Sequence, residues 1–278
     1  MLVNKVEMPK RRLLIRPGAI GDFIVSLPAL GHAATAAYAE IWTPETNLPL
    51  VRFAGAKRSI ISSGLDRLGL MPADDVIARL RRFDSIVSWY GTNRPEFRQL
   101  VADAGLPFEF HPALPPEGTG VHAVDHYCAQ VGAPPGAIPH IDVGPVELHN
   151  SVVLHPFASR EDKRWPGGAD FSLPKRGYRR VSLVKLRGPE EHLPGAIYIP
   201  DLFELARFLA GARAYIGNDS GITHLAAAVG IPTIALFGPT DPAVWSPRGK
   251  KVKVIQATTM AEIPPEAVIA ALSEFGIY

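Results

Sequence analysis

Short apolar runs alternate with amphipathic stretches along most of this sequence. The runs typical of buried strands are residues 12–16, 39–42, 85–90, 151–156, 214–217, 232–238 and 252–256. The stretches with helical periodicity are residues 23–34, 94–105, 122–133, 202–212, 223–230 and 264–275. Strands that alternate with helices predict an α/β protein with parallel sheets covered on both faces.

A proline-rich segment interrupts this alternation near the middle of the chain. Residues 133–150 (APPGAIPHIDVGPVELHN) lack helical periodicity, and a new strand pattern begins directly after them. Such segments are typical of linkers between domains. We therefore predict two domains, residues 1–140 and 141–278, with a cleft between them.

Composition narrows the classes of protein that fit. Of 278 residues, 47% are hydrophobic, and no stretch is long and apolar enough to predict a membrane span. The 29 basic and 27 acidic residues leave a net charge of +2, which lacks the strong positive field of a dedicated nucleic-acid-binding protein. The single cysteine, Cys128, excludes an intramolecular disulfide, and the basic start of the chain lacks the apolar core of a signal peptide. These features predict a soluble cytoplasmic protein.

The first loop with unusual residues follows the first predicted strand. Ligands of open parallel sheets bind beyond the carboxyl ends of the strands. In RPGAIGD (16–22), Gly18 and Gly21 allow a sharp turn and close approach of the backbone to a ligand. Asp22 falls near the first turn of the next helix, where it either faces the ligand or serves only as a helix cap.

A second loop, HPFASREDKRWP (155–166), carries a basic pair. Lys163 and Arg164 follow a strand end and lie close in sequence to Ser159. An ammonium group with a hydroxyl donor forms a plausible phosphate-binding pair. The alternative is a solvated run of charges.

A third loop, GNDSGITH (217–224), joins a strand to a helix. The amides of Ser220, Gly221 and Ile222 would be free at the helix N-terminus, which favours phosphate binding. Asp219 would repel a phosphate, so we expect it to contact sugar hydroxyls. The alternative is that Asp219 only caps the helix and that His224 is a polar residue of its first turns.

Three blocks of sequence together resemble glycosyltransferase family 9, the bacterial ADP-heptose:lipopolysaccharide heptosyltransferases. They are RPGAIGDFIVSLPAL, LHPFASREDKRWP and GNDSGITHLAAAVGIPTIALFGPTDPAVWSP, in the order of the family and in both halves of the chain. The resemblance implies a GT-B fold, in which two Rossmann-like domains face a cleft. The acceptor would bind to the first domain and the nucleotide-sugar donor to the second. In this fold the last helix commonly packs back on the first domain, and residues 263–278 are expected to do so.

The resemblance also assigns roles to individual residues. The catalytic aspartate of the family falls on Asp22, in a loop whose Gly18 and Gly21 lie near the acceptor. The donor-binding positions of the family fall on Ser159, Lys163, Asp219, Ser220, Gly221 and His224. RGPEE resembles the turn that contacts the nucleoside, with either Glu190 or Glu191 as the equivalent residue.

The sequence departs from the family between the second and third blocks. Residues 166–201 are short, contain several prolines and leave little room for the two helices that the family has there. Ala158 stands where the family often has a second hydroxyl residue. The donor domain is therefore expected to be trimmed.

The implied activity is an inverting, metal-independent transfer of heptose from ADP-heptose to an inner-core lipopolysaccharide acceptor, with no cofactor. Two alternatives stay open: a non-catalytic member that binds a sugar nucleotide, and transfer of another sugar to another acceptor. No nucleic acid or obligate protein partner is expected. The protein would act in the cytoplasm, with peripheral contact at the cytoplasmic face of the inner membrane as a further expectation.

Two basic clusters in the first half could serve an anionic acceptor. Their members are Arg52, Lys57, Arg58, Arg94 and Arg98. Positive charges suit carboxylate and phosphate groups. Such clusters more often decorate a solvated face.

Three other functional classes fit the sequence less well. An NAD-dependent oxidoreductase, with Glu40 on the ribose, would need the G-x-G-x-x-G fingerprint that the first loop lacks. His122 and His126 have helical spacing but no third metal ligand nearby. A G-x-S-x-G nucleophile motif is absent.

Overall fold

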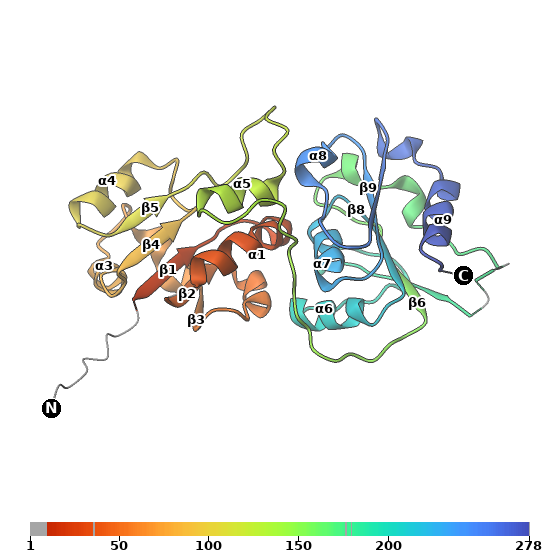
Figure 1. The fold of residues 1–278 in the computed structure, drawn as a ribbon, viewed down its shortest axis with the longest axis horizontal. Helices are drawn as coiled ribbons and strands as arrows, with labels where there is room; N and C mark the ends of the chain where they lie inside the picture. Colours follow the sequence, from red (N-terminus) through yellow and green to blue (C-terminus); the bar gives the residue numbers. More distant parts are fainter. Residues whose placement is uncertain (1–9, 36, 176, 179, 278) are drawn as a thin grey trace.

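The chain forms two α/β halves that lie side by side, as Figure 1 shows for this computed structural model. The structure describes residues 10–35, 37–175, 177–178 and 180–277. Residues 1–9 lie outside the described residues. They are the beginning of the first predicted domain and of the basic segment in which no signal peptide is expected. Each half is built around a five-stranded parallel sheet, which confirms the predicted fold class.

The first sheet has the strand order β3-β2-β1-β4-β5. Its strands are β1 (Arg11–Ile15), β2 (Tyr38–Thr43), β3 (Ala56–Ser59), β4 (Ser85–Ser88) and β5 (Phe108–Phe110). The helices of this half are α1 (Ile20–Ala34), η1 (Glu45–Leu50), α2 (Ile60–Ser63), η2 (Leu65–Arg67), α3 (Asp74–Leu80), α4 (Pro95–Asp103) and α5 (Ala123–Gln130). Strand β1 is central, and its side chains pack into different cores on the two faces: Leu14 on one, Leu13 and Ile15 on the other. This two-sided burial explains the uninterrupted apolar run of its sequence.

The second sheet has the order β10-β9-β8-β6-β7. Its strands are β6 (Ser151–His155), β7 (Ser182–Lys185), β8 (Ala214–Asn218), β9 (Thr233–Phe237) and β10 (Val252–Gln256). The helices are η3 (Glu161–Lys163), η4 (Pro166–Gly168), α6 (Leu202–Ala210), α7 (Gly221–Val229), α8 (Pro242–Trp245), η5 (Met260–Glu262) and α9 (Pro265–Glu274). The strand order changes direction between β1 and β4 in the first sheet and between β6 and β8 in the second. Open α/β sheets bind ligands at such positions.

Helices are sparse beside β6 and β7 in the described part of the second half. Among the described residues, only the short turns η3 and η4 lie between β6 and β7. Between β7 and α6 the structure describes no helix, and a bridge between Leu186 and Ile197 extends the sheet there. This edge of the sheet therefore has little helical cover.

The prediction that the last helix packs on the first half is wrong. Helix α9 contacts β9 and β10, and its buried side chains Val268 and Leu272 join a core with Leu154 and Ile216 of its own sheet. Figure 1 shows α9 on the side of the second half that is remote from the first. The physical reason is that the apolar stripe of α9 covers a face of its own sheet, where its buried side chains complete a core.

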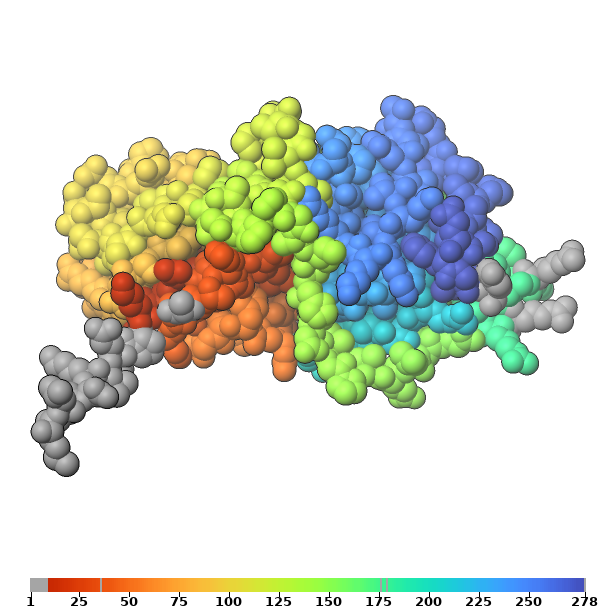
Figure 2. Space-filling view, in the orientation of Figure 1, coloured from red at the N-terminus to blue at the C-terminus, as the bar shows by residue number. Residues whose placement is uncertain are grey.

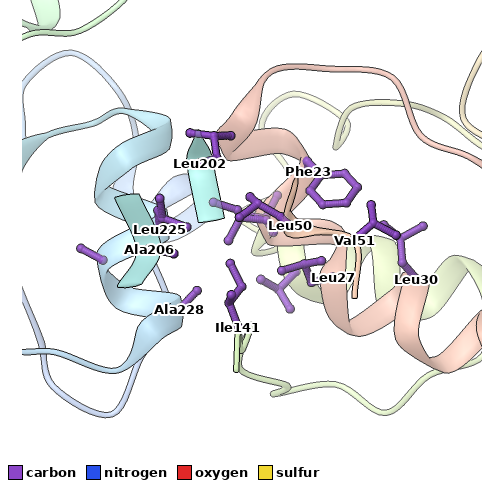
Figure 3. Close-up of a cluster of buried hydrophobic side chains, with 14 of the residues drawn as sticks. Phe23, Leu27, Leu30, Leu50, Val51, Ile141, Leu202, Ala206, Leu225 and Ala228 are labelled. Carbon is purple, nitrogen blue, oxygen red and sulfur yellow. The ribbon is translucent and has the colours of Figure 1, made fainter. Parts of the chain in front are cut away.

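An apolar interface joins the two halves. Helix α1 packs against α7, and α6 packs against η1. Figure 3 shows Leu27 and Leu50 of the first half, Ile141 of the linker, and Leu202 and Leu225 of the second half in one buried cluster. In Figure 2 the green linker residues run along the boundary between the halves. A shared hydrophobic core of this kind restrains relative motion of the halves.

Polar contacts add a second connection between the halves. The Arg248 guanidinium donates to both carboxylate oxygens of Asp125, at 2.7 Å for the Nη1–Oδ1 pair. Hydrogen bonding from Arg248 lowers the pKa of Asp125 to about 2. His122 Nε2 lies 2.9 Å from the carbonyl oxygen of Ser246.

No helix in the described ranges has both the length and the apolarity to cross a bilayer.

Candidate functional site

A cavity of about 280 Å³ lies between the halves, where loops after β1, β6 and β8 meet. Its lining residues are Ala19, Gly21, Asp22, Leu114, Ser159, Lys163, Asp219, Ser220, Gly221, His224, Thr240 and Trp245. All three loops singled out from the sequence therefore contribute to one site. We refer to this space as the interdomain cavity.

The β1–α1 loop places Asp22 in the interdomain cavity through a turn that needs glycine. Gly18 has φ +111°, a backbone conformation that side chains disfavour, and a Cβ atom there would lie 2.8 Å from Cβ of Asp22. The Asp22 Oδ2 atom accepts a hydrogen bond from the Ala19 amide at 3.0 Å. Asp22 is thus both a cap of its own helix and a half-buried carboxylate of the cavity wall, so the two interpretations of this residue are compatible.

Two helix N-termini, one from each half, meet at the interdomain cavity. A Cβ atom on Gly221 would lie 2.8 Å from Cβ of Ile20 and 2.9 Å from the amide nitrogen of Gly21. The starts of α1 and α7 can therefore come this close only because small residues stand there. Each helix start carries partial positive charge and unpaired amides, which favour an anionic ligand.

Lys163 and Asp219 form a close ion pair in the interdomain cavity. Their Nζ and Oδ2 atoms are 2.6 Å apart, and the side chains are 19% and 10% exposed. The sequence predicts that Asp219 contacts sugar hydroxyls or only caps the helix. In the structure Asp219 holds the Lys163 ammonium beside the start of α7, so its own charge is balanced. Ser159 lies on the exposed rim of the same cavity.

His224, the fourth residue of α7, is a buried and uncharged base. Only 6% of the residue is exposed. Burial lowers its pKa to about 4, although the charges of Asp219 and Asp22 oppose this shift. The imidazole is therefore uncharged at neutral pH.

The buried His224 predicts a pH dependence of stability. Between its ordinary pKa of 6.5 and the folded-state value of about 4, the unfolded chain binds a proton that the folded protein does not. The free energy of unfolding should therefore decrease as pH falls through this window. We expect His224→Gln to flatten the decrease, measured by urea unfolding at a series of pH values. The control is His192→Gln at an exposed position, and equal slopes for the His224 variant and the native protein would contradict the assignment.

A second cavity of about 250 Å³ adjoins the first. It is lined mostly by apolar groups, by Ile20, Thr46, His155, Leu186, Arg187, Gly188, Pro189, Glu191, Tyr198, Ile199, Pro200, Leu202, Leu205 and Ile222. The cavities share a boundary, since Ile20 and Ile222 are chain neighbours of Gly21 and Gly221. We refer to this space as the apolar cavity.

Of the two glutamates in RGPEE, only Glu191 lines the apolar cavity, whereas Glu190 is exposed. The Glu191 carboxylate lies 3.4 Å from His155 Nε2 and accepts the Gly188 amide. Burial raises the pKa of Glu191, but the hydrogen bonds from His155 and Gly188 outweigh it, and the net pKa is lowered. Glu191 is therefore an ionised acceptor at the polar end of this cavity.

The five basic residues suggested for the acceptor line neither the interdomain cavity nor the apolar cavity. The Arg52 guanidinium lies over the Phe203 ring, and Lys57 Nζ donates to the Leu48 carbonyl. The remaining three pair with groups on the first half: Arg58 with Glu40, Arg94 with Tyr90 and Arg98 with the Phe110 ring. A role of these residues in binding an anionic acceptor stays a prediction.

Some residues that line the interdomain cavity are not among the site residues predicted from the sequence. Leu114 lies in the loop after β5, and Thr240 and Trp245 lie at either end of the α8 segment. Trp245 belongs to the third block, where a role for the aromatic ring could have been considered. Leu114 stands in a stretch without periodicity or motif.

Metal ligands do not gather in the described part of the chain, where no group of three or more His, Cys, Asp or Glu side chains could hold an ion. The two histidines with helical spacing make other contacts. His122 Nδ1 accepts the Val124 amide, and His126 lies 2.8 Å from the Gln130 amide group.

Comparisons with known proteins agree on one family. Residues 200–266 match the family described as glycosyltransferase family 9 (heptosyltransferase). Lipopolysaccharide heptosyltransferase 1 of Pseudomonas aeruginosa PAO1 is 45% identical over 201 residues, which cover 68% of this chain and 51% of that protein. The chain spans about half the length of the curated relatives it matches, between 42% and 51% of the first three.

Solved structures show the same fold. E. coli ADP-heptose lipopolysaccharide heptosyltransferase II has a TM-score of 0.73 and 17% identity, covering 95% of this chain and 98% of that chain. E. coli heptosyltransferase WaaC with ADP has a TM-score of 0.64 and 18% identity, covering 95% of this chain and 99% of that chain. The architecture is thus GT-B, with two Rossmann-like halves. The match of residues 200–266 and the 45% identity to the P. aeruginosa protein show that the chain belongs to glycosyltransferase family 9.

Proposed function

We propose that this protein is a glycosyltransferase that transfers heptose from ADP-heptose to an inner-core lipopolysaccharide acceptor, inverting the anomeric carbon in one displacement. The observation that carries the proposal is the interdomain cavity, where Asp22 of the first half shares a wall with Lys163 and the start of α7 from the second. A base on one side and an anion-binding group on the other are the two requirements of such a transfer.

Asp22 is the proposed general base. Its Oδ2 atom is held by the Ala19 amide, so we assign the proton transfer to Oδ1. This atom removes the proton from the acceptor hydroxyl while the hydroxyl oxygen forms a bond to the anomeric carbon of the donor. The bond from that carbon to the diphosphate oxygen breaks at the same time, and its electron pair leaves with the diphosphate.

Lys163 and the amides of Ser220 and Gly221 stabilise the departing diphosphate in this proposal. The ammonium group is already oriented by Asp219 at 2.6 Å, so little reorganisation is needed when charge develops. The helix start adds partial positive charge at the same place. We assign Ser159 on the rim as a further hydroxyl donor to the phosphates.

The apolar cavity is the proposed nucleoside site. Its walls suit a planar base, and the ionised Glu191 suits the two ribose hydroxyls. Adenine is supported by likeness to the WaaC structure with ADP. We further infer that the acceptor is an anionic, lipid-linked sugar met at the cytoplasmic face of the inner membrane, with no nucleic acid or second protein taking part.

A second candidate is a family member that binds the sugar nucleotide without turning it over. The sparse helical cover beside β6 and β7 in the described residues favours it, because it leaves the proposed donor half with little support at this edge. The test is to incubate the protein with ADP-heptose and Kdo-bearing lipid A, and to measure ADP release and the mass of the acceptor. Glycosylated acceptor supports the enzyme, whereas donor binding without product supports the second candidate. A thermal-shift panel of ADP-, UDP- and GDP-sugars identifies the nucleotide.

Metal independence is a separate prediction. Because Lys163 and the α7 amides provide the positive charge that a metal ion would otherwise supply, transfer should proceed at the full rate in excess EDTA. The initial rate is measured with and without the chelator, after dialysis against it. Strict dependence on added magnesium or iron would contradict this part of the mechanism.

A further inference from the structure

Arg16 is a buried cation beneath the loop that carries Asp22. It is the residue after β1, and only 1% of it is exposed. In the ranges that the structure describes, no carboxylate lies within 4.0 Å of its guanidinium. A buried charge without a counter-ion is costly, so other contacts or a function must account for it.

The guanidinium joins two walls of the interdomain cavity. Its Nη2 donates to the Asp22 carbonyl at 2.9 Å, and its Nε donates to Ser26 Oγ at 3.0 Å. Its other side lies over the Tyr127 ring, with Cζ 4.5 Å from the centroid. The Tyr127 hydroxyl in turn donates to the Ala113 carbonyl at 2.8 Å, next to Leu114 of the cavity wall. One side chain therefore supports both the first turn of α1 and the loop after β5.

The charges around Asp22 leave Arg16 as an uncompensated cation below it. Lys163 is paired with Asp219 across the cavity. His224 on α7 is neutral because burial lowers its pKa. On α5 and its N-cap, burial raises the pKa of the Tyr127 hydroxyl and lowers the pKa of His122 and of His126. These groups carry no charge at neutral pH.

We propose that Arg16 is a positioning residue for Asp22: it fixes the first turn of α1 and keeps the carboxylate ionised when an acceptor covers the cavity. The inference rests on the proposed role of Asp22 as general base. Bound acceptor removes water from around Asp22, which favours the protonated carboxyl group. A fixed positive charge on the protein side of the loop opposes that change.

The test is the pH profile of kcat for Arg16→Met and Arg16→Lys at saturating acceptor, because kcat reports the groups that titrate in the enzyme–substrate complex. We expect Arg16→Met to raise the pH of the acidic limb by about one unit or more and to lower kcat more than it raises KM for the donor. Arg16→Lys keeps the charge but loses the planar pair of hydrogen bonds. Its acidic limb should stay near that of the native protein while kcat falls about tenfold, as loss of positioning alone implies.

Arg12→Met is a matched control, because Arg12 lies in β1, the strand that Arg16 directly follows. Arg12 donates to Ser85 Oγ at 3.0 Å and to the Ala33 carbonyl at 2.8 Å, so it supports the other end of α1 with the same kinds of contact. It should lower stability without moving the acidic limb. An unchanged limb in Arg16→Met, or an equal shift in Arg12→Met, would overturn the inference.

Three further outcomes are distinguished when Asp22→Asn is assayed beside the Arg16 variants. If Arg16→Met does not fold, the decision falls to Arg16→Lys, and a kcat equal to that of the native protein would overturn the positioning role. Full activity of Asp22→Asn would remove the general base, and with it the proposed mechanism. Loss of activity in Asp22→Asn together with an unchanged profile in the Arg16 variants would refute only the role of Arg16.

Discussion

Asp22→Asn should lower kcat for sugar transfer by a factor of about 10² to 10⁴, the range expected when a general base is removed. The amide side chain keeps an oxygen that can accept the Ala19 amide, so the start of α1 should stay folded. It cannot take a proton from the acceptor hydroxyl. ADP release in the presence of acceptor measures the loss, and calorimetry with ADP should give an unchanged affinity, because the donor groups lie on the second half.

A helix-capping carboxylate elsewhere provides the control for this experiment. Asp201 begins α6 and accepts the amides of Phe203 and Glu204, at 2.8 and 3.0 Å. Asp201→Asn should change stability slightly and leave turnover intact. If Asp22→Asn kept native turnover, Asp22 would be only a cap, and the general base would have to be sought elsewhere in the cavity.

The strands and helices that could be predicted are those whose own side chains are buried in a regular pattern. Strand β1 is an example, because both of its faces are covered and its apolar run is continuous. Strand β3 could not be predicted in this way. It has the sequence AKRS, and it forms because the edge of β2 pairs with it, not because of its own hydrophobicity. The short strand β7 is a similar case.

The parts of the candidate site that could be predicted are those in loops that directly follow strands. Loops after β1, β6 and β8 must reach the carboxyl edges of their sheets, so the positions of Asp22, Lys163 and Asp219 follow from topology. The ion pair of Lys163 with Asp219 joins residues 56 positions apart, and its geometry depends on how the two loops pack. The burial of Arg16 likewise depends on α5, a helix from a distant part of the chain.

Gly221→Ala should be the most damaging small substitution at the boundary between the halves. The added methyl group would lie 2.8 Å from Cβ of Ile20 and 2.9 Å from the backbone nitrogen of Gly21, and backbone cannot move aside as a flexible side chain can. Overpacking of this kind costs about 1 to 3 kcal/mol in the free energy of unfolding. The displaced start of α7 should also separate the diphosphate-binding amides from Asp22, so turnover should fall. Urea unfolding and the transfer assay measure the two effects.

Two other glycines make the result specific to this contact. A Cβ atom on Gly31, inside α1, would meet nothing within 4 Å, so Gly31→Ala should be neutral or stabilise by about 0.5 to 1 kcal/mol through helix propensity. A Cβ atom on Gly21 would lie 3.4 Å from the His224 ring, so Gly21→Ala should have an intermediate effect. The expected order of stability is therefore Gly31→Ala, then Gly21→Ala, then Gly221→Ala. Native stability and native turnover in Gly221→Ala would mean that the starts of α1 and α7 separate in solution, and that the cavity does not depend on their contact.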